Sequence, residues 1–249
     1  SPLVNIVCTV FLLIAALNFS LHYAAVSSRS VKGYFKDPEF KAFFFIQATL
    51  ILICFLVLVL SGFYESAETA LDQAMIQAVS ISTTAGFATT DFSVWPTFLP
   101  ILLIFSSFIG GCASSTGGGL KVVRVCLLFL QGKREVDRLI HPKAVYAVKL
   151  GERAMPDRVV EAVWGFFSAY AVVFVILMVG LIATGLDNLS AFTATAAMLN
   201  NLGPGLGSVA SNYADVSDPG KWILVVGMVF GRLEVFSLLV LFSPTFWRS

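Results

Sequence analysis

The chain has 249 residues, of which 57% are hydrophobic and only 12% are charged, and its mean hydropathy is +0.87. A water-soluble domain of this length needs far more charged surface, so the composition excludes an ordinary soluble protein and indicates a bilayer protein. The formal net charge of +1 gives no basis for binding nucleic acid.

Five apolar segments approach or exceed the roughly 20 residues that a helix needs to cross a bilayer. They are residues 3–26, 42–63, 95–113, 159–184 and 221–242. A shorter apolar run, residues 120–130, follows a glycine-rich stretch, and we interpret it as the second part of the helix that begins near Trp95. The pattern predicts an all-α membrane protein.

Basic residues predict the orientation of these helices, because cytoplasmic loops carry the excess of Lys and Arg. They gather in residues 27–41 and 132–158, whereas residues 42–120 and 159–220 contain none. We therefore expect both basic loops and the C-terminus to be cytoplasmic. The outer segments carry acidic residues, whose negative potential would concentrate cations: Glu65, Glu68, Asp72, Asp91, Asp187, Asp215 and Asp218.

Two outer segments are predicted to be helices too short to cross. Residues 66–81 ("SAETALDQAMIQAVSI") and 188–199 ("NLSAFTATAAML") would span roughly 18 to 24 Å. Each leads into a polar turn with glycine, "STTAGFATT" or "NNLGPGLGS", and then into another apolar helix. The order helix, half-helix, turn, helix thus occurs twice, with Gly86 and Gly203 in matching positions.

These turns predict a cation site, because irregular backbone at membrane depth must be buried in protein or line water. Inward carbonyl oxygens can replace the hydration shell of an alkali cation, and the half-helix C-terminus adds negative potential. Glycine permits the backbone dihedrals required. The turns contain no carboxylate, which favours K⁺ or Na⁺ over Ca²⁺. The alternative is an ordinary glycine-rich loop.

The stretch "GGCASSTGGGLK", residues 110–121, predicts a break in the helix, since each glycine costs about 1 kcal/mol relative to alanine. It is either a packing kink or a flexible gate beneath the turns, and we favour the gate. Arg232 is costly in an apolar helix, and Glu234 does not face it. Arg232 either pairs with another helix or lies beside the ion path. Lys121 and Arg124 are expected to reach lipid headgroups.

The remaining polar features suggest little chemistry. The basic segment 131–158 is expected to lie against anionic lipid or to dock a regulatory subunit. The histidines and cysteines lack metal-ligand or disulfide spacing. No constellation suits catalysis, so we expect neither an enzyme nor a cofactor.

Four stretches carry a resemblance to a known family: "STTAGFATTDFSVWP", "MLNNLGPGLGSVASNYADVSDPGKW", "SSTGGGLKVVR" and "GRLEVFSLLVLFSPTFWR". The chain resembles the TrkH proteins of the TrkH, KtrB and HKT superfamily of potassium transporters. The resemblance implies four joined helix, pore-helix, helix repeats of potassium-channel type around one pore. This chain would be the C-terminal half, with residues 1–26 ending the second repeat, 42–131 forming the third and 159–249 the fourth.

The resemblance also implies roles for individual residues. The selectivity filter would comprise Thr84, Ala85, Gly86 and Phe87 with Asn201, Leu202, Gly203 and Pro204. The gating loop would include Gly110, Gly111, Ser114, Ser115, Thr116, Gly117, Gly118 and Gly119, and Arg232 would face the pore. The second filter segment lacks the hydroxyl that precedes glycine in "TTAG", so its coordination would rest on backbone carbonyls.

The same resemblance implies a bacterial inner-membrane protein that forms a homodimer and is controlled by TrkA, a cytosolic nucleotide-binding subunit. Two further pore loops, absent from this chain, would complete the filter. The leading hypothesis is gated potassium uptake. The alternatives are an ion-coupled secondary transporter with broken helices and a membrane scaffold without transport activity.

Overall fold

The computed structural model describes residues 2–233, 235, 240 and 246–248. Helices dominate this part of the chain, which confirms the predicted all-α class. The strands described are β1 (Lys149–Leu150) and β2 (Arg153–Ala154), which pair in antiparallel register as a small hairpin.

Two helices in the described part are each long and apolar enough to cross a membrane: α4 (Pro38–Leu60) and α8 (Asp157–Ala183). They confirm the expectations for residues 42–63 and 159–184. Helix α4 begins earlier than expected because the Asp37 side chain accepts a hydrogen bond from the Phe40 amide at 2.8 Å. Pro38 also suits the first helical turn.

The prediction of one continuous helix over residues 3–26 is wrong, although the two helices that form instead are together long and apolar enough for a broken span. The segment forms α1 (Pro2–Ala15) and α2 (Phe19–Ser28), which meet at 91° and are followed by the short α3 (Lys32–Lys36). Asn18 starts the second helix by accepting a hydrogen bond from the Ser20 amide at 2.8 Å. The Ala16 carbonyl at the bend accepts from the Cys112 amide at 2.8 Å. A backbone carbonyl freed by the break is thus hydrogen-bonded to a segment far along the chain.

The predicted crossing over residues 95–113 is also shorter than expected. Helix α6 (Leu99–Ile109) follows a 3₁₀ turn, η1 (Phe92–Val94). Pro100 is tolerated in the first turn of α6 but not deeper inside a helix. Gly110, at φ 71°, ends the helix. The predicted break after α6 is confirmed.

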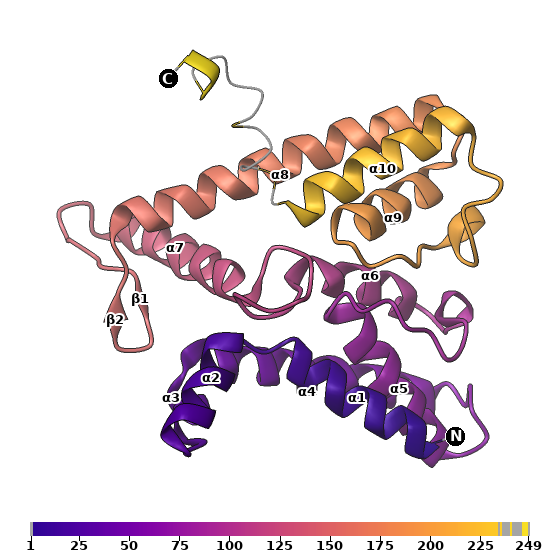
Figure 1. Ribbon diagram of the computed structural model, residues 1–249, viewed down its shortest axis with the longest axis horizontal. Helices are drawn as coiled ribbons and strands as arrows, with labels where there is room; N and C mark the ends of the chain where they lie inside the picture. The colour runs from indigo at the N-terminus through magenta and orange to yellow at the C-terminus, as the bar shows by residue number, and fades with distance from the viewer. Residues whose placement is uncertain (1, 234, 236–239, 241–245, 249) are drawn as a thin grey trace.

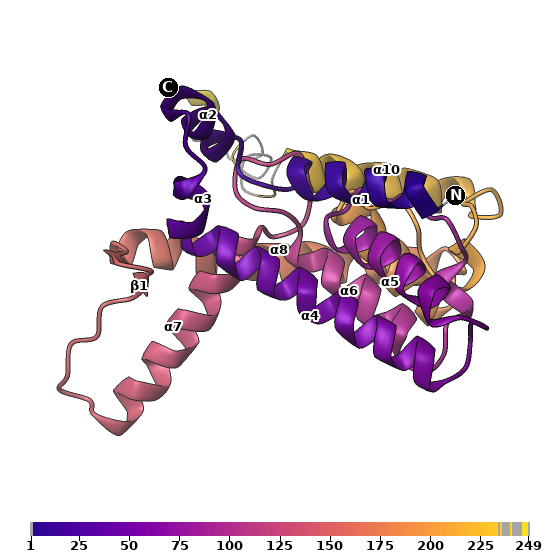
Figure 2. The ribbon, with the colours of Figure 1, turned by 90° about the horizontal axis from the view of Figure 1, so that it is seen from below.

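Helix α7 (Val122–Ile140) extends beyond the run 120–130 and into the segment 132–158 that was expected to be a loop. Its polar half is held by Gln131 donating to Glu135 at 2.7 Å, one helical turn apart. Arg134, buried against the start of α8, donates to Asp157 at 2.6 Å. Figure 2 shows α7 diverging from the helices that surround α5.

The two short helices are confirmed as α5 (Ala67–Ser82) and α9 (Asn188–Leu199). Each begins with a side-chain cap: the Ser66 hydroxyl accepts a hydrogen bond from the Thr69 amide, and the Asp187 carboxylate accepts one from the Ser190 amide, both at 3.1 Å. After α9 come η2 (Gly207–Val209), α10 (Asp218–Arg232) and η3 (Phe246–Arg248). Part of the predicted crossing over residues 221–242 lies outside the described residues.

The chain forms two similar units that share one core (Figure 1). Helix α5 packs against α4, α1 and α6, and α9 packs against α8, α10 and α6. Small side chains on the half-helices, such as Ala74 and Ala194, allow close approach and are fully buried. Each half-helix therefore ends inside protein.

Candidate functional site

The turns that end the two half-helices have the same backbone. In the first turn, residues 84–87, φ is positive at Thr84 (62°) and Gly86 (77°). In the second turn, residues 201–204, φ is positive at Asn201 (55°) and Gly203 (102°). The intervening residue of each turn keeps a negative φ. The repeat expected from the sequence therefore extends to the order of positive and negative φ angles in the two turns.

The hydrogen bonds of the two turns match as well. The Ala85 and Gly86 amides both donate to the Ser80 carbonyl, at 2.8 and 3.3 Å. The Leu202 and Gly203 amides both donate to the Ala197 carbonyl, at 2.7 and 3.4 Å.

This pattern fixes the direction of the carbonyl oxygens. In a trans peptide the C=O points opposite to the N–H of the next residue. Because the N–H groups of Ala85 and Gly86 point back to α5, the carbonyls of Thr84 and Ala85 point away from it. The same argument directs the carbonyls of Asn201 and Leu202 away from α9.

The two turns lie against each other. A methyl group added at Gly86 would come within 2.1 Å of the Leu202 carbonyl oxygen and 3.4 Å of the Pro204 ring. The oxygen of the second turn therefore faces the backbone of the first. The corresponding position in the second turn, Gly203, has open space around it, and its carbonyl accepts a hydrogen bond from the Tyr213 hydroxyl at 2.7 Å.

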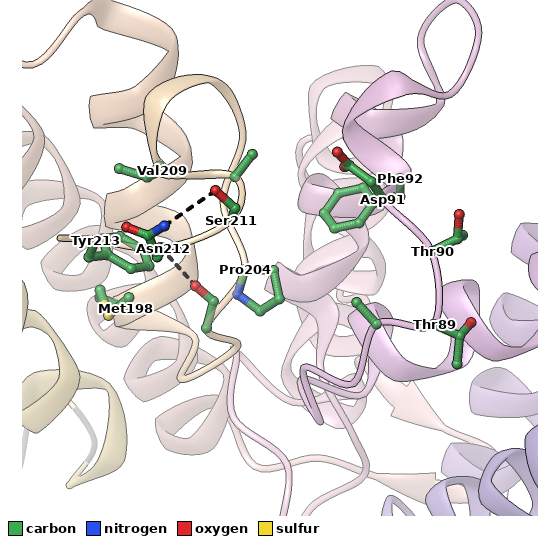
Figure 3. A pocket seen from close by; sticks show the side chains of 13 residues that line it. Thr89, Thr90, Asp91, Phe92, Met198, Pro204, Val209, Ser211, Asn212 and Tyr213 are labelled. Carbon is green, nitrogen blue, oxygen red and sulfur yellow. Dashed lines mark hydrogen bonds between the residues drawn. The ribbon is translucent and has the colours of Figure 1, made fainter. Parts of the chain in front are cut away.

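A cavity of about 650 Å³ opens beside the turns, between the two units (Figure 3). Residues 88–92 line one side, and residues from 203 to 213 line the other. Asp91 supplies the acidic group of this lining. Pro204 borders the cavity, whereas Phe87 is 64% exposed and is not among the lining residues.

Buried polar side chains support both turns from behind, and sequence reasoning missed them. The Tyr170 hydroxyl donates to the side-chain oxygen of Asn200 at 2.6 Å, and the side-chain nitrogen of Asn200 donates to the Ser107 hydroxyl at 2.9 Å. In the other unit, Ser82 donates to Gln47 at 2.9 Å. Gln47 and Tyr170 interrupt long apolar helices, which is the signal that could have identified them.

The glycine-rich loop, residues 110–119, lies against both turns. The Gly118 amide donates to the Thr84 hydroxyl at 2.6 Å, and a methyl group at Gly118 would lie 1.9 Å from the Asn200 carbonyl oxygen. The loop also contacts the bend between α1 and α2, where the Ser114 carbonyl accepts from the Phe19 amide at 3.3 Å and Thr116 donates its hydroxyl to Ala15 at 3.2 Å. The expected loop residues are thus gathered next to the expected filter residues.

Three basic side chains contact protein near this loop. Arg232 donates to the Thr116 carbonyl at 3.3 Å, while Glu234 lies outside the described residues. Lys121 donates to the Ser115 carbonyl at 3.3 Å and to the Gly117 carbonyl. The Arg124 guanidinium lies 4.2 Å from the centre of the Phe166 ring. Lys121 and Arg124 therefore contact loop carbonyls and an aromatic face, and the expectation that they reach headgroups stays a prediction.

The electrostatics of the turns favour a cation. The C-terminal ends of α5 and α9 both point to the turns, and each carries about half a negative charge. Hydrogen bonds from Ser190 hold the pKa of Asp187 below its usual range, so its charge stays at the opposite end of α9. Within the described residues, no cluster of His, Cys, Asp and Glu could hold a metal ion. A cation at the turns would therefore be bound by backbone and hydroxyl oxygens.

We predict that alanine is tolerated differently at the two matched glycines. Both substitutions strain a positive φ, at about 1 to 2 kcal/mol. Gly86→Ala also forces the turns apart, which adds roughly 1 to 3 kcal/mol of overpacking, whereas Gly203→Ala meets open space. The midpoint of thermal unfolding in detergent should be clearly lower for G86A. Equal midpoints would show that the turns are not in contact.

Comparison with known proteins agrees with this geometry. The family model TrkH, described as a cation transport protein, matches residues 1–249. The chain is 64% identical over 248 residues to the Trk system potassium uptake protein TrkH of Vibrio parahaemolyticus serotype O3:K6 (strain RIMD 2210633), covering 99% of this chain and 51% of that protein. It is 36% identical over 247 residues to the Trk system potassium uptake protein TrkG of Escherichia coli (strain K12), covering 99% and 51% respectively.

The structural comparison gives the same relationship. The crystal structure of the potassium transporter TrkH from Vibrio parahaemolyticus matches with a TM-score of 0.95 and 64% sequence identity, covering 100% of this chain and 53% of that chain. The chain spans about half the length of the curated relatives it matches. The match runs along the whole chain and includes both half-helices, both turns and the glycine-rich loop. The chain belongs to the TrkH family of cation transport proteins.

Proposed function

We propose that this chain forms one half of a potassium-conducting pore that mediates K⁺ uptake. The observation that carries the proposal is the meeting of two turns with matched backbone, each at the negative end of a buried half-helix. Relatives named as potassium uptake proteins support the choice of ion.

The filter assigned to this chain consists of the two turns. Thr84, Ala85, Gly86 and Phe87 form one side, and Asn201, Leu202, Gly203 and Pro204 form another. Carbonyl oxygens directed away from the half-helices replace part of the hydration shell of K⁺. The other two sides come from the rest of the protein, which fits the twofold greater length of the relatives.

The glycine-rich loop is the gate in this proposal. It lies directly under the turns and binds them at Thr84, so an ion leaving the filter meets the loop. Its three consecutive glycines permit a change of backbone conformation at low steric cost. Arg232, which binds the Thr116 carbonyl, steadies the closed loop and adds a positive charge to the path.

The proposal extends to location and partners. Residues 1–26, 42–131 and 159–249 are assigned to the second, third and fourth pore repeats in a bacterial inner membrane. The loops 27–41 and 132–158 and the C-terminus are cytoplasmic. The protein is a homodimer regulated by TrkA, and the description of the relatives as parts of a Trk system supports a multi-component assembly.

Ion flux tests the filter. The full-length protein in liposomes should pass K⁺ and Rb⁺ at least roughly ten-fold faster than Li⁺, which corresponds to about 1.4 kcal/mol of discrimination. Equal fluxes would refute a selective filter. Flux that saturates and requires a second ion gradient would favour the ion-coupled secondary transporter instead.

Loop length tests the gate. Removing one glycine from residues 117–119 should raise K⁺ flux several-fold, because the shortened loop no longer reaches Thr84 beneath the filter. The ratio of Rb⁺ to Li⁺ flux in the same liposomes is the internal control and should stay unchanged. Unchanged flux and unchanged regulation would make the loop a packing kink.

A further inference from the structure

Glu39 is a buried carboxylate in the first turn of α4, with only 6% of its surface exposed. One of its oxygens, Oε1, accepts two backbone hydrogen bonds, from the Ala113 amide at 2.6 Å and from the Val123 amide at 3.1 Å. Ala113 belongs to the glycine-rich loop, and Val123 belongs to the first turn of α7. A single oxygen therefore joins the first half of the proposed gate to the helix that follows it.

This carboxylate fills a gap in the capping of α7. The first amides of a helix have no partner within the helix, and a negative charge at that end is stabilising. Lys121, at the N-cap position, turns its amine to the loop carbonyls instead. Glu39 reaches in from α4 and caps the helix at Val123.

Several other contacts of the loop join two neutral groups. Thr84 accepts from Gly118, and the bend between α1 and α2 contacts Cys112, Ser114 and Thr116. Hydrogen bonds to a charged acceptor are roughly twice as strong as those between neutral groups. The two bonds to Glu39 are therefore charge-assisted, as are the bonds that Lys121 and Arg232 donate to loop carbonyls, and Glu39 is the charged acceptor among these groups.

We propose that Glu39 is a positioning residue that holds the glycine-rich loop against the filter turns. The effect of Glu39 on ion flux rests on the proposed gating function of the loop. The effect of Glu39 on the position of the loop does not, because that position can be measured without measuring flux. Cys112 provides that measurement. Its thiol is next to Ala113, and only 1% of its surface is exposed.

Two substitutions at Glu39 separate the loss of the negative charge from the loss of the hydrogen-bond acceptor. Glu39→Gln keeps an oxygen where both amides donate but removes the charge, whereas Glu39→Ala removes the acceptor. The full-length protein is reconstituted in liposomes and treated with a membrane-permeant maleimide, and modification of Cys112 is followed by peptide mass spectrometry. The rate should rise roughly five-fold or more in E39A and less in E39Q, because the loop opens more often. Rb⁺ flux should rise in the same order.

Glu161→Ala is the matched control, because Glu161 is an exposed carboxylate near the start of α8, the equivalent helix of the other unit. It should leave labelling and flux unchanged. A folded E39A protein with wild-type labelling of Cys112 would overturn the proposal. Increased labelling without increased flux would support the role of Glu39 and refute the gate. If E39A does not fold, wild-type labelling in E39Q would overturn the proposal, and faster labelling would support it.

Discussion

The structure depends on one constraint: a peptide group inside a bilayer must be hydrogen-bonded within the protein or must face water. Both half-helices end inside the protein, so their last residues need partners from the chain itself. The amides of each turn are satisfied by a carbonyl of the preceding helix, at Ser80 and at Ala197. The carbonyls of the turns are then directed to the space between the two units. In the proposed filter, these carbonyls are the oxygen ligands of the cation.

The glycine-rich loop obeys the same constraint by binding irregular backbone elsewhere. It pairs with the bend between α1 and α2, with the Thr84 hydroxyl and with the Glu39 carboxylate. Two interruptions of helical structure therefore satisfy each other. In the proposed gate, such pairing permits opening, since every partner of the loop is a single side chain or a few backbone groups that can be released one at a time.

Local features of the sequence were sufficient to predict the half-helices, the turns and the break after α6. Caps such as Ser66 and Asp187, short apolar runs and glycines act through neighbouring residues, so one sequence reveals them. The bend after Ala15 was missed, because its local signal is the Asn18 cap within an apolar run and its partner Cys112 is distant in the chain. The contacts of Glu39 and Tyr170 were missed because their partners are also distant in the chain. Long-range partners become visible only when the fold brings them together.

The most direct test of the central claim is the anomalous scattering of Rb⁺ in crystals of the full-length protein. The account predicts an ion peak between the two turns, within coordination distance of the carbonyl oxygens of residues 84, 85, 201 and 202. A map with no peak between the turns, or with the bound ion held by side-chain carboxylates elsewhere, would contradict it.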